Sequence, residues 1–502
     1  MLVCDKLKSG IFVKDIILTT INAKWIHPSL ALRLLKANLG SLEDSCEIIE
    51  FALRQPLAEK LEPLLAANPR ILGISVSIWN HLAAIELLKE LEKHWTGIPA
   101  ENKPIIVFGG PEVSHLPEDA EIFQYADYVI RGEGELAFRL LCEKLLAGEK
   151  EVNKFIIAEN VNLNNIKTAY HLYTDEDVTR KLVYVESSRG CVFNCEFCLS
   201  AVKAENKVRE FPLEPFLTEM DILIKRGVRT FKFLDRSFNT NIKRALQIID
   251  FFLKKINPTL IPSVPPPNLR FDVCVNSSLN NSAPFTVHFE MVPTLFPPEL
   301  LEALTRFPPG TLRLEIGIQT LNPQVSERIK LSGGKERYNN PEKLMENLRF
   351  LSEKTSAIIH ADLIAGLPGE DLDSFGRGFD RLWQALKEPG INSAAEIQLG
   401  ILKLLPGAPI SCHKETYGMK FSDLPPYEIK ETSSISANDL QRIKNFARFW
   451  EIIVNRGLII LKNEPIFNKF MIFSDELYAF FGKNWGIDKN DLLNFINVRL
   501  KF

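Results

Sequence analysis

The chain has 502 residues, of which 46% are hydrophobic and 25% charged, with a formal net charge of −3. This length predicts two or three domains, and the composition is that of an ordinary globular protein. The small net charge argues against a general electrostatic attraction to nucleic acid. No run approaches the roughly 20 apolar residues of a membrane span, and residues 1–10 carry no secretory signal, so we expect a cytoplasmic protein.

Residues 1–150 alternate between apolar strand-like runs and segments of helical periodicity. The expected strands are 15–21, 71–77, 104–108 and 126–130, and the expected helices are 28–39, 81–93 and 136–146. This alternation predicts an α/β domain with a doubly wound, Rossmann-like parallel sheet. Ligands bind such sheets at the carboxyl ends of the strands, where this sequence places Gly109, Gly110, Gly132 and Gly134.

A second α/β series follows residues 151–180, which are polar and rich in asparagine and are expected to be a linker. Its expected strands are 182–186, 230–234, 286–290, 312–316, 357–364 and 396–401. Six strands separated by helices predict a partial barrel over residues 181–412 instead of a complete eight-stranded one. The Pro-rich stretch at about 257–282 interrupts the pattern and is expected to be an inserted loop.

Residues 413–502 are expected to form a mostly helical domain. Ser436 and Asp439 resemble a capping box at the start of a helix, and Gly457 closes it. The aromatic and aliphatic residues between them repeat at helical spacing, which indicates a buried face more often than a cofactor site.

Eight cysteines are too few for a disulfide scaffold, and five of them are isolated in the sequence. The isolated ones, which are expected to be small buried hydrophobes, are Cys4, Cys46, Cys142, Cys274 and Cys412. The other three, Cys191, Cys195 and Cys198, form a C-x₃-C-x₂-C run that follows an expected strand.

Three thiolates this close can ligate one [4Fe–4S] cluster, which ordinarily takes four cysteines. Three ligands leave one iron open to an external chelator, and S-adenosylmethionine (SAM) can bind there through its amino and carboxylate groups. The alternative is a structural zinc site, but zinc usually takes four ligands, commonly as two separated pairs. This sequence has no second pair and no histidine near the run.

The cysteine run, with Phe197 before its last cysteine, resembles the signature of the radical SAM superfamily. Further matching segments follow in the family's order: F-E-M at 289–291, G-I-Q-T at 317–320, D-L-I-A-G-L-P-G-E at 362–370 and L-K-L-L-P-G at 402–407. The G-G-E usual after the second strand is replaced by residues 234–239, where Asp235 is the candidate for that glutamate's role toward the SAM amino group. The resemblance implies that SAM is contacted by Phe197, Asp235, Glu290, Gln319, Thr320 and Ile364.

The first 150 residues resemble the cobalamin-binding domain that precedes the radical SAM barrel in one large subfamily. The matching loops contain Ser75 and Ser77, Gly109 and Gly110, and Gly132 and Glu133. Glycines let the backbone approach a macrocycle or its nucleotide tail, and the serine hydroxyls can bond the tail's base. The D-x-H-x-x-G cobalt-ligand motif is incomplete, because Trp25 and Leu30 replace its Asp and Gly around His27; we expect cobalt without a histidine ligand. A domain that binds no cofactor is the alternative.

The arrangement as a whole resembles cobalamin-binding radical SAM proteins with a C-terminal domain of unknown function (DUF4080-like). The resemblance implies a [4Fe–4S] cluster, SAM and cobalamin, a 5′-deoxyadenosyl radical, and methyl transfer to an unactivated carbon of a small-molecule or peptide substrate. It also implies a reductase, flavodoxin or ferredoxin as electron donor. From the net charge and the lack of a long apolar run, we expect neither nucleic acid nor a membrane as partner. Three alternatives remain open: oxidative cyclisation or rearrangement, methylthio transfer to tRNA or a ribosomal protein, and a non-enzymatic cobalamin or redox sensor.

Overall fold

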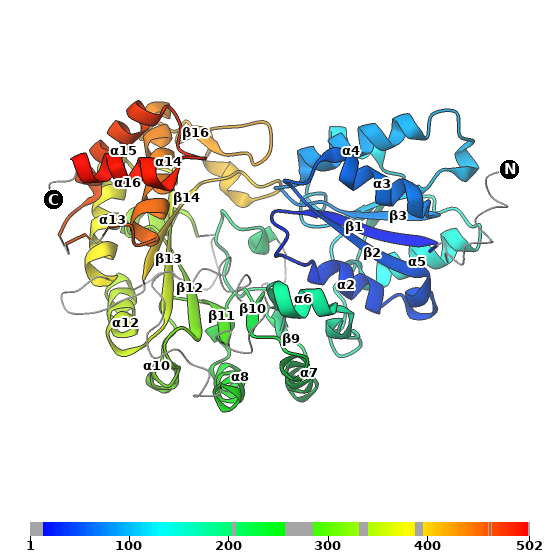
Figure 1. Cartoon of the computed structure of the whole chain (residues 1–502), viewed down its shortest axis with the longest axis horizontal. Helices are drawn as coiled ribbons and strands as arrows, with labels where there is room; N and C mark the ends of the chain where they lie inside the picture. Colours follow the sequence, from blue (N-terminus) through cyan, green and yellow to red (C-terminus); the bar gives the residue numbers. More distant parts are fainter. Residues whose placement is uncertain are drawn as a thin grey trace. The chain divides into compact units, whose positions relative to one another are not determined.

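The computed structural model of the chain (Figure 1) describes residues 14–202, 207–256, 285–330, 340–386, 395–459, 461–462 and 464–499. It divides into two compact units, the first running to Tyr184 with the addition of Lys225–Gly227, and the second comprising the remaining residues from Val185 onward. The expected Pro-rich insertion, Cys4 and Cys274 lie outside the described residues. No helix in the described ranges is long and apolar enough to cross a membrane.

The first unit is built on a six-stranded parallel sheet in the order β2-β1-β3-β4-β5-β6. The strands are β1 (Ile16–Asn22), β2 (Cys46–Ala52), β3 (Ile71–Ser75), β4 (Ile105–Gly109), β5 (Tyr128–Arg131) and β6 (Phe155–Ile157). The helices are α2 (Leu30–Ala37), α3 (Leu57–Ala67), α4 (His81–His94), α5 (Gly134–Leu146) and α6 (Asp175–Arg180). Helices α3 and α4 cover one face and α2 and α5 the other (Figure 1), each over its own apolar core. Helices on both faces of a parallel sheet confirm the predicted doubly wound domain.

Part of the expected linker contributes to the first unit. Residues 155–157 form the edge strand β6, and Asp177, on α6, contacts Arg33 of α2 at 2.7 Å across 144 sequence positions. Arg33 also contacts Glu50 at 2.8 Å and lies over the Tyr173 ring. A polar, Asn-rich composition indicates a loop, but it cannot reveal a docking contact made by two charged side chains so far apart.

The second unit contains another six-stranded parallel sheet, in the order β14-β13-β12-β11-β10-β7, which confirms the predicted partial barrel. Its strands are β7 (Val183–Val185), β10 (Thr230–Phe233), β11 (Thr286–Met291), β12 (Leu312–Gln319), β13 (Ile358–Ala365) and β14 (Glu396–Ile401). Along the outside lie α7 (Leu213–Lys225), α8 (Ile242–Lys255), α10 (Pro298–Thr305), α12 (Pro341–Lys354) and α13 (Leu372–Leu386) (Figure 1). Alternate strand residues such as Phe231 pack on these helices, for example against Phe252 of α8 at 5.2 Å between ring centroids.

The tail contains α14 (Ala437–Trp450), α15 (Phe467–Phe481) and α16 (Lys489–Arg499) and belongs to the second unit. The Ser436 hydroxyl accepts a hydrogen bond from the Asp439 N–H at 3.1 Å, and this caps α14 as predicted. Trp450 is 1% exposed and packs edge-on against Phe379 of α13, at 4.8 Å between ring centroids. The predicted aromatic stripe is therefore core that attaches the tail to the barrel.

Candidate functional site

The three clustered cysteines lie on a loop that begins directly after the short strand β8 (Ser188–Arg189). Cys191 and Cys195 are each 7% exposed, and Cys198 is half-buried. The Cys198 N–H donates to the Cys195 carbonyl at 3.0 Å, which turns the chain between these two thiols. The apolar side chains packed with the cysteines are Val192, Phe193, Phe197 and Val292. The loop thus gathers three thiol donors in a nearly dry setting.

Gly190 makes the turn into this loop. Its φ of +94° lies in the region that L-residues avoid, and a Cβ here would come within 2.2 Å of the Lys207 carbonyl oxygen. A real Cβ cannot occupy that position, so only glycine lets β8 run beside β9 (Arg209–Glu210) and still turn into the cysteine loop.

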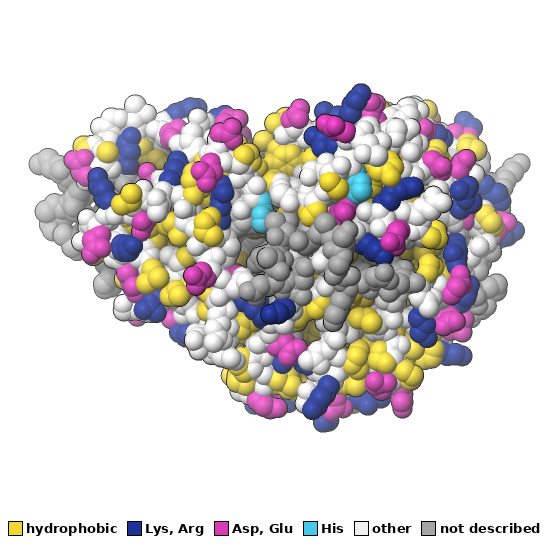
Figure 2. Space-filling view, turned by 180° about the vertical axis from the view of Figure 1, so that it is seen from behind, with side chains coloured by type: hydrophobic (Ala, Val, Ile, Leu, Met, Phe, Trp, Pro, Cys, Tyr) yellow, Lys and Arg dark blue, Asp and Glu magenta, His cyan; other side chains and the backbone are white. Residues whose placement is uncertain are grey.

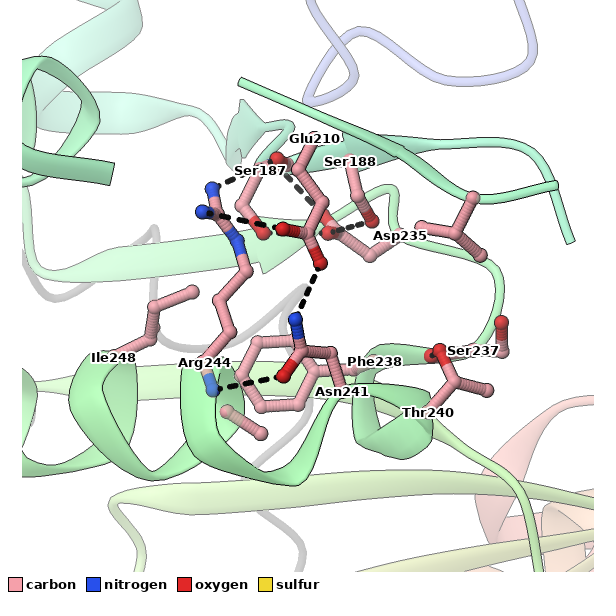
Figure 3. A pocket seen from close by; sticks show the side chains of 12 residues that line it. Ser187, Ser188, Glu210, Asp235, Ser237, Phe238, Thr240, Asn241, Arg244 and Ile248 are labelled. Atoms are coloured by element: carbon pink, nitrogen blue, oxygen red, sulfur yellow. Dashed lines mark hydrogen bonds and ion pairs between the residues drawn. The ribbon is translucent and has the colours of Figure 1, made fainter. Parts of the chain in front are cut away.

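Asp235 is buried beneath the entry to the cysteine loop and is 1% exposed. Its Oδ1 accepts the hydroxyls of Ser187 and Ser188, both at 2.6 Å, and its Oδ2 accepts the Ser187 N–H at 2.9 Å. Burial raises the pKa of this carboxyl, while the three hydrogen bonds act in the opposite direction. Figure 3 shows the three residues beside a small pocket whose lining also includes Glu210 and Arg244. Asp235, which we predicted to contact SAM, therefore holds the start of the segment that carries the cysteines.

The other residues predicted to contact SAM in the barrel lie on three neighbouring strands. Glu290 is half-buried near the end of β11, Gln319 is 9% exposed at the end of β12, and Ile364 is half-buried near the end of β13. Gln319 has a φ of +68° where the register between β12 and β13 shifts. The fold thus places these residues along one edge of the sheet, formed by the carboxyl ends of the strands, where α/β barrels hold their active sites.

Glu370 is a buried acid beside this edge that the sequence interpretation did not single out. It is 1% exposed, and its Oε1 accepts the Thr320 hydroxyl at 2.6 Å, whereas Oε2 has no hydrogen-bond partner among the described residues. Burial raises the pKa of Glu370 to about 7; the Thr320 hydrogen bond opposes this rise, and nearby Asp371 adds to it. The sequence feature that could have identified Glu370 is its position at the end of the L-P-G-E segment.

The sheet face away from the helices carries a polar network that was also missed. His288 Nε2 lies 3.1 Å from Glu315 Oε2, and Lys232 Nζ lies 3.5 Å from the same oxygen. Burial lowers the pKa of His288 to about 4. Burial alone would raise the pKa of Glu315, but His288 and Lys232 outweigh it and hold that pKa at about 2. Polar residues alternating with apolar ones along the strands were the signal for a face not covered by helices.

In the first unit, Ser75 and Ser77 lie at the carboxyl end of β3 and just beyond it. Asn80 ties this loop down: its Oδ1 accepts the Ser77 N–H at 2.8 Å, and its Nδ2 donates to the Ser75 and Ile21 carbonyls at 3.2 and 3.1 Å. Beside the loop, the Trp79 side chain is 51% exposed. The strand ends thus carry a braced polar loop next to an exposed aromatic surface.

The two glycine loops of the first unit are joined by Ser114. Its hydroxyl donates to the Gly110 carbonyl at 2.8 Å and accepts the Gly132 N–H at 3.3 Å. A Cβ on Gly110 would come within 2.5 Å of the Val76 carbonyl oxygen, whereas one on Gly109 would meet nothing closer than 4.0 Å. Gly110 is thus needed for the packing of this loop, whereas Gly109 has open space where its side chain would be.

Two further predicted residues already have protein partners in the first unit. Glu133 Oε2 accepts the Val161 N–H at 3.0 Å. The His27 Nδ1 lies 2.8 Å from the Tyr184 hydroxyl.

Cys46 and Cys142 lie in the apolar core of the first unit, and both are at most 1% exposed. Burial raises the pKa of both thiols, that of Cys46 to about 12. Their place in this core confirms the expectation of small buried hydrophobes for these two cysteines, whereas Cys412 is exposed and that expectation is wrong for it.

Lys and Arg side chains are interspersed with Asp and Glu on the face shown in Figure 2. Such mixing gives no one-signed field across that face to attract a polyanion.

Comparison with known families assigns both units. Residues 185–382 match the family model of the Radical SAM superfamily, and residues 16–141 match that of the B12 binding domain. The chain therefore contains a Radical SAM domain preceded by a B12-binding domain.

Its curated relatives include methyltransferases. TokK of Streptomyces tokunonensis, a cobalamin-dependent radical SAM methyltransferase, is 23% identical over 382 residues, covering 70% of this chain and 50% of TokK. The 2-(S-pantetheinyl)-carbapenam-3-carboxylate methyltransferase of Streptantibioticus cattleyicolor is also 23% identical, covering 71% and 50%. An uncharacterized methyltransferase of Pyrococcus horikoshii is 32% identical over 163 residues, 28% of this chain and 36% of the relative. The chain spans half or less of the length of each of these three proteins.

Solved structures show the same fold. The cobalamin-dependent SAM radical enzyme OxsB, solved with aqua-cobalamin and S-adenosylmethionine, superposes with a TM-score of 0.62 at 16% identity, over 99% of this chain and 76% of OxsB. The radical SAM methyltransferase TsrM from Kitasatospora setae, solved with tryptophan and a SAM analogue, has a TM-score of 0.58 at 16% identity, over 82% and 79%.

Proposed function

We propose that this chain is a cobalamin-dependent radical SAM enzyme that cleaves SAM reductively and transfers a methyl group to an unactivated carbon of its substrate. One observation carries the proposal: three cysteines, two of them buried and one half-buried, lie in one apolar cluster of the radical SAM unit of a chain that also has a B12-binding domain. The methyltransferase names of TokK and of the carbapenam enzyme support methyl transfer over cyclisation or rearrangement.

The donor set suits a [4Fe–4S] cluster with one open iron. Cys191, Cys195 and Cys198 supply three thiols, and four cysteines are the usual complement. Phe193 and Val292 belong to the same buried cluster as Cys191 and Cys195 and shield these two cysteines from water. Clusters of this kind need reduced cysteines, so the proposal includes a cytoplasmic location. Reductive cleavage of SAM consumes an electron, so it also includes an electron donor such as flavodoxin or ferredoxin.

For SAM, we propose contacts from Phe197 on the cysteine loop and from residues at or directly after the strand ends, namely Glu290, Gln319, Thr320 and Ile364. The polar groups lie on neighbouring strand ends of one sheet, a layout that can bind the amino acid and ribose parts of SAM. Asp235 acts indirectly in this scheme, because its oxygens already bind Ser187 and Ser188 and so fix the start of the loop.

For cobalamin, the strand ends of the first unit offer a suitable surface. Asn80 braces the loop of Ser75 and Ser77, Gly109 leaves room for close approach, and Trp79 presents an exposed ring to an apolar macrocycle. The Tyr184 hydroxyl contacts only Nδ1 of His27, and our proposal of cobalt without a histidine ligand rests on the incomplete sequence motif around His27. When bound, the cluster with SAM supplies a 5′-deoxyadenosyl radical and methylcobalamin supplies the methyl group.

The test is anaerobic reconstitution with iron and sulfide, followed by dithionite, SAM and hydroxocobalamin. We expect 5′-deoxyadenosine by mass spectrometry and a cobalamin spectrum that persists through desalting. Cys195→Ala should abolish deoxyadenosine, whereas Cys412→Ala, at an exposed cysteine outside the loop, should not. A cluster whose EPR signal does not respond to SAM would overturn the proposal in favour of a sensor.

A further inference from the structure

Glu196 lies between the second and third cysteines of the loop and is itself buried, at 6% exposed. Its Oε2 lies 2.5 Å from Nε2 of His413, a residue 217 positions further along the chain. An ionised carboxylate can only accept, so the His413 Nε2–H donates. His413 ends the short helix η10 (Pro409–His413), which follows the last strand of the barrel.

The backbone of Glu196 is held by two more segments. Its N–H donates to the Ile329 carbonyl at 2.9 Å, and its carbonyl accepts the Ile410 N–H, also at 2.9 Å. The preceding Cys195 forms an isolated antiparallel bridge with Lys330. Glu196 is thus the point where the cysteine loop is attached both to the segment after β12 and to η10.

The contacts continue from His413 toward the loop after β13. The His413 ring lies edge-on to Tyr417 at 5.7 Å, and the Arg328 guanidinium lies over the Tyr417 ring at 5.2 Å. Arg328 Nη1 donates to the Pro368 carbonyl at 3.2 Å, inside the L-P-G-E segment. The next residue, Gly369, has a φ of +73°, a conformation that favours glycine, and the Arg328 side chain packs directly against it.

We propose that Glu196 and His413 are positioning residues that hold the segment between Cys195 and Cys198 in place, so that the cluster stays seated and its open iron faces SAM. This inference rests on the proposed function. The buried hydrogen bond between Glu196 and His413 attaches the segment between Cys195 and Cys198 to the barrel. Residues that orient metal ligands in this way determine how tightly a metal centre is retained.

A separate metal ion is the competing interpretation, because Glu196, Cys412 and His413 place one ligand atom each within 4.8 Å of one another. The short carboxylate–imidazole distance argues against it. Two ligands at about 2.0 Å from a tetrahedral zinc lie about 3.3 Å apart, whereas these atoms are 2.5 Å apart, as in a charge-assisted hydrogen bond.

The test compares Glu196→Ala, His413→Ala, the double variant and the conservative Glu196→Gln, each reconstituted in the full chain. The matched control is Glu342→Ala, which removes an ion pair to Arg381 at 2.7 Å on the outer helices of the same unit. The readouts are iron release to a chelator, the EPR change on adding SAM, and zinc content. His413 is more exposed than Glu196, so His413→Ala can still test the inference if Glu196→Ala does not fold.

We expect both alanine variants to release iron about 10-fold faster than wild type and to show an altered EPR response to SAM. The double variant should be no worse than either single one, because the two side chains act as one unit. Glu196→Gln, which still accepts from His413, should stay near wild type.

Release rates and spectra equal to those of wild type and Glu342→Ala would overturn the inference. So would one zinc per wild-type chain that is lost in Cys412→Ser. A wild-type protein that assembles no cluster would instead overturn the proposed function itself, which separates the two failures.

Discussion

The carboxylate of Asp235 binds both polar donors of Ser187, the backbone N–H at 2.9 Å and the hydroxyl at 2.6 Å. Ser187 lies four residues before Cys191, so this contact fixes the chain where it enters the cysteine loop. Asp235, which we expected to bind SAM from its sequence position, thereby supports the loop that carries the three proposed cluster ligands.

Replacing Asp235 by alanine should destabilise the second unit and weaken cluster binding. It leaves the buried Ser187 N–H and the hydroxyls of Ser187 and Ser188 without their acceptor, which costs about 3 kcal/mol in the free energy of unfolding. Urea unfolding and iron content measure the two effects. Asp250→Ala, at an exposed pair with Lys254, is the control and should change neither. A cluster retained at wild-type levels would contradict the role of Asp235 as a loop support.

Gly190→Ala should abolish cluster assembly while leaving the secondary structure intact. The added Cβ cannot coexist with the Lys207 carbonyl oxygen, and the backbone conformation is itself strained for alanine, by about 1–3 kcal/mol. Iron analysis with circular dichroism checks this. Gly378→Ala on α13 is the matched control, because its Cβ would meet only ordinary contacts at 3.6 Å. Full cluster content in Gly190→Ala would show that the loop can enter by another path.

Glu370 should make the second unit less stable as the pH rises. Its pKa of about 7 in the folded protein exceeds the ordinary value of 4.5, so the folded state binds the proton more tightly than the unfolded state. Its contribution is fully present below pH 4.5 and is lost as the pH rises through about 7, by roughly 3 kcal/mol.

Glu370→Gln, which can still accept from Thr320, should remove this loss. The measurement is the urea midpoint of wild type and variant at pH 5 and pH 8, where the variant should gain stability relative to wild type only at the higher pH. Equal differences at both pH values would mean that the acid does not titrate in this range.

Arg33→Met should destabilise the first unit by about 3 kcal/mol or more, because it leaves the carboxylates of Glu50 and Asp177 without their buried partner. Differential scanning calorimetry measures it. Arg139→Met, which removes the exposed pair with Glu143, is the control and should cost under about 1 kcal/mol. An Arg33→Met protein as stable as wild type would show that residues 170–184 do not depend on this contact for docking.

Most strands of both sheets could be predicted from the sequence, because buried parallel strands are short apolar runs that stand out between polar loops. β2 was missed, since its run 46–52 contains two glutamates, Glu47 and Glu50. β6 was missed because three apolar residues in a polar stretch carry no periodicity. The pairing of Arg33 with Asp177 had no signal in either local segment.

The sequence alone determined the cysteine loop and the order of the barrel motifs, because ligand spacing within eight residues and glycine-rich turns are local properties of the chain. Only the tertiary structure decided which groups support that loop. Asp235 meets Ser187 across 48 positions and Glu196 meets His413 across 217, and such contacts follow from how the strands are brought together in one sheet. Buried polar groups form hydrogen bonds with the partners that the fold brings within reach, and a local sequence pattern does not predict those partners.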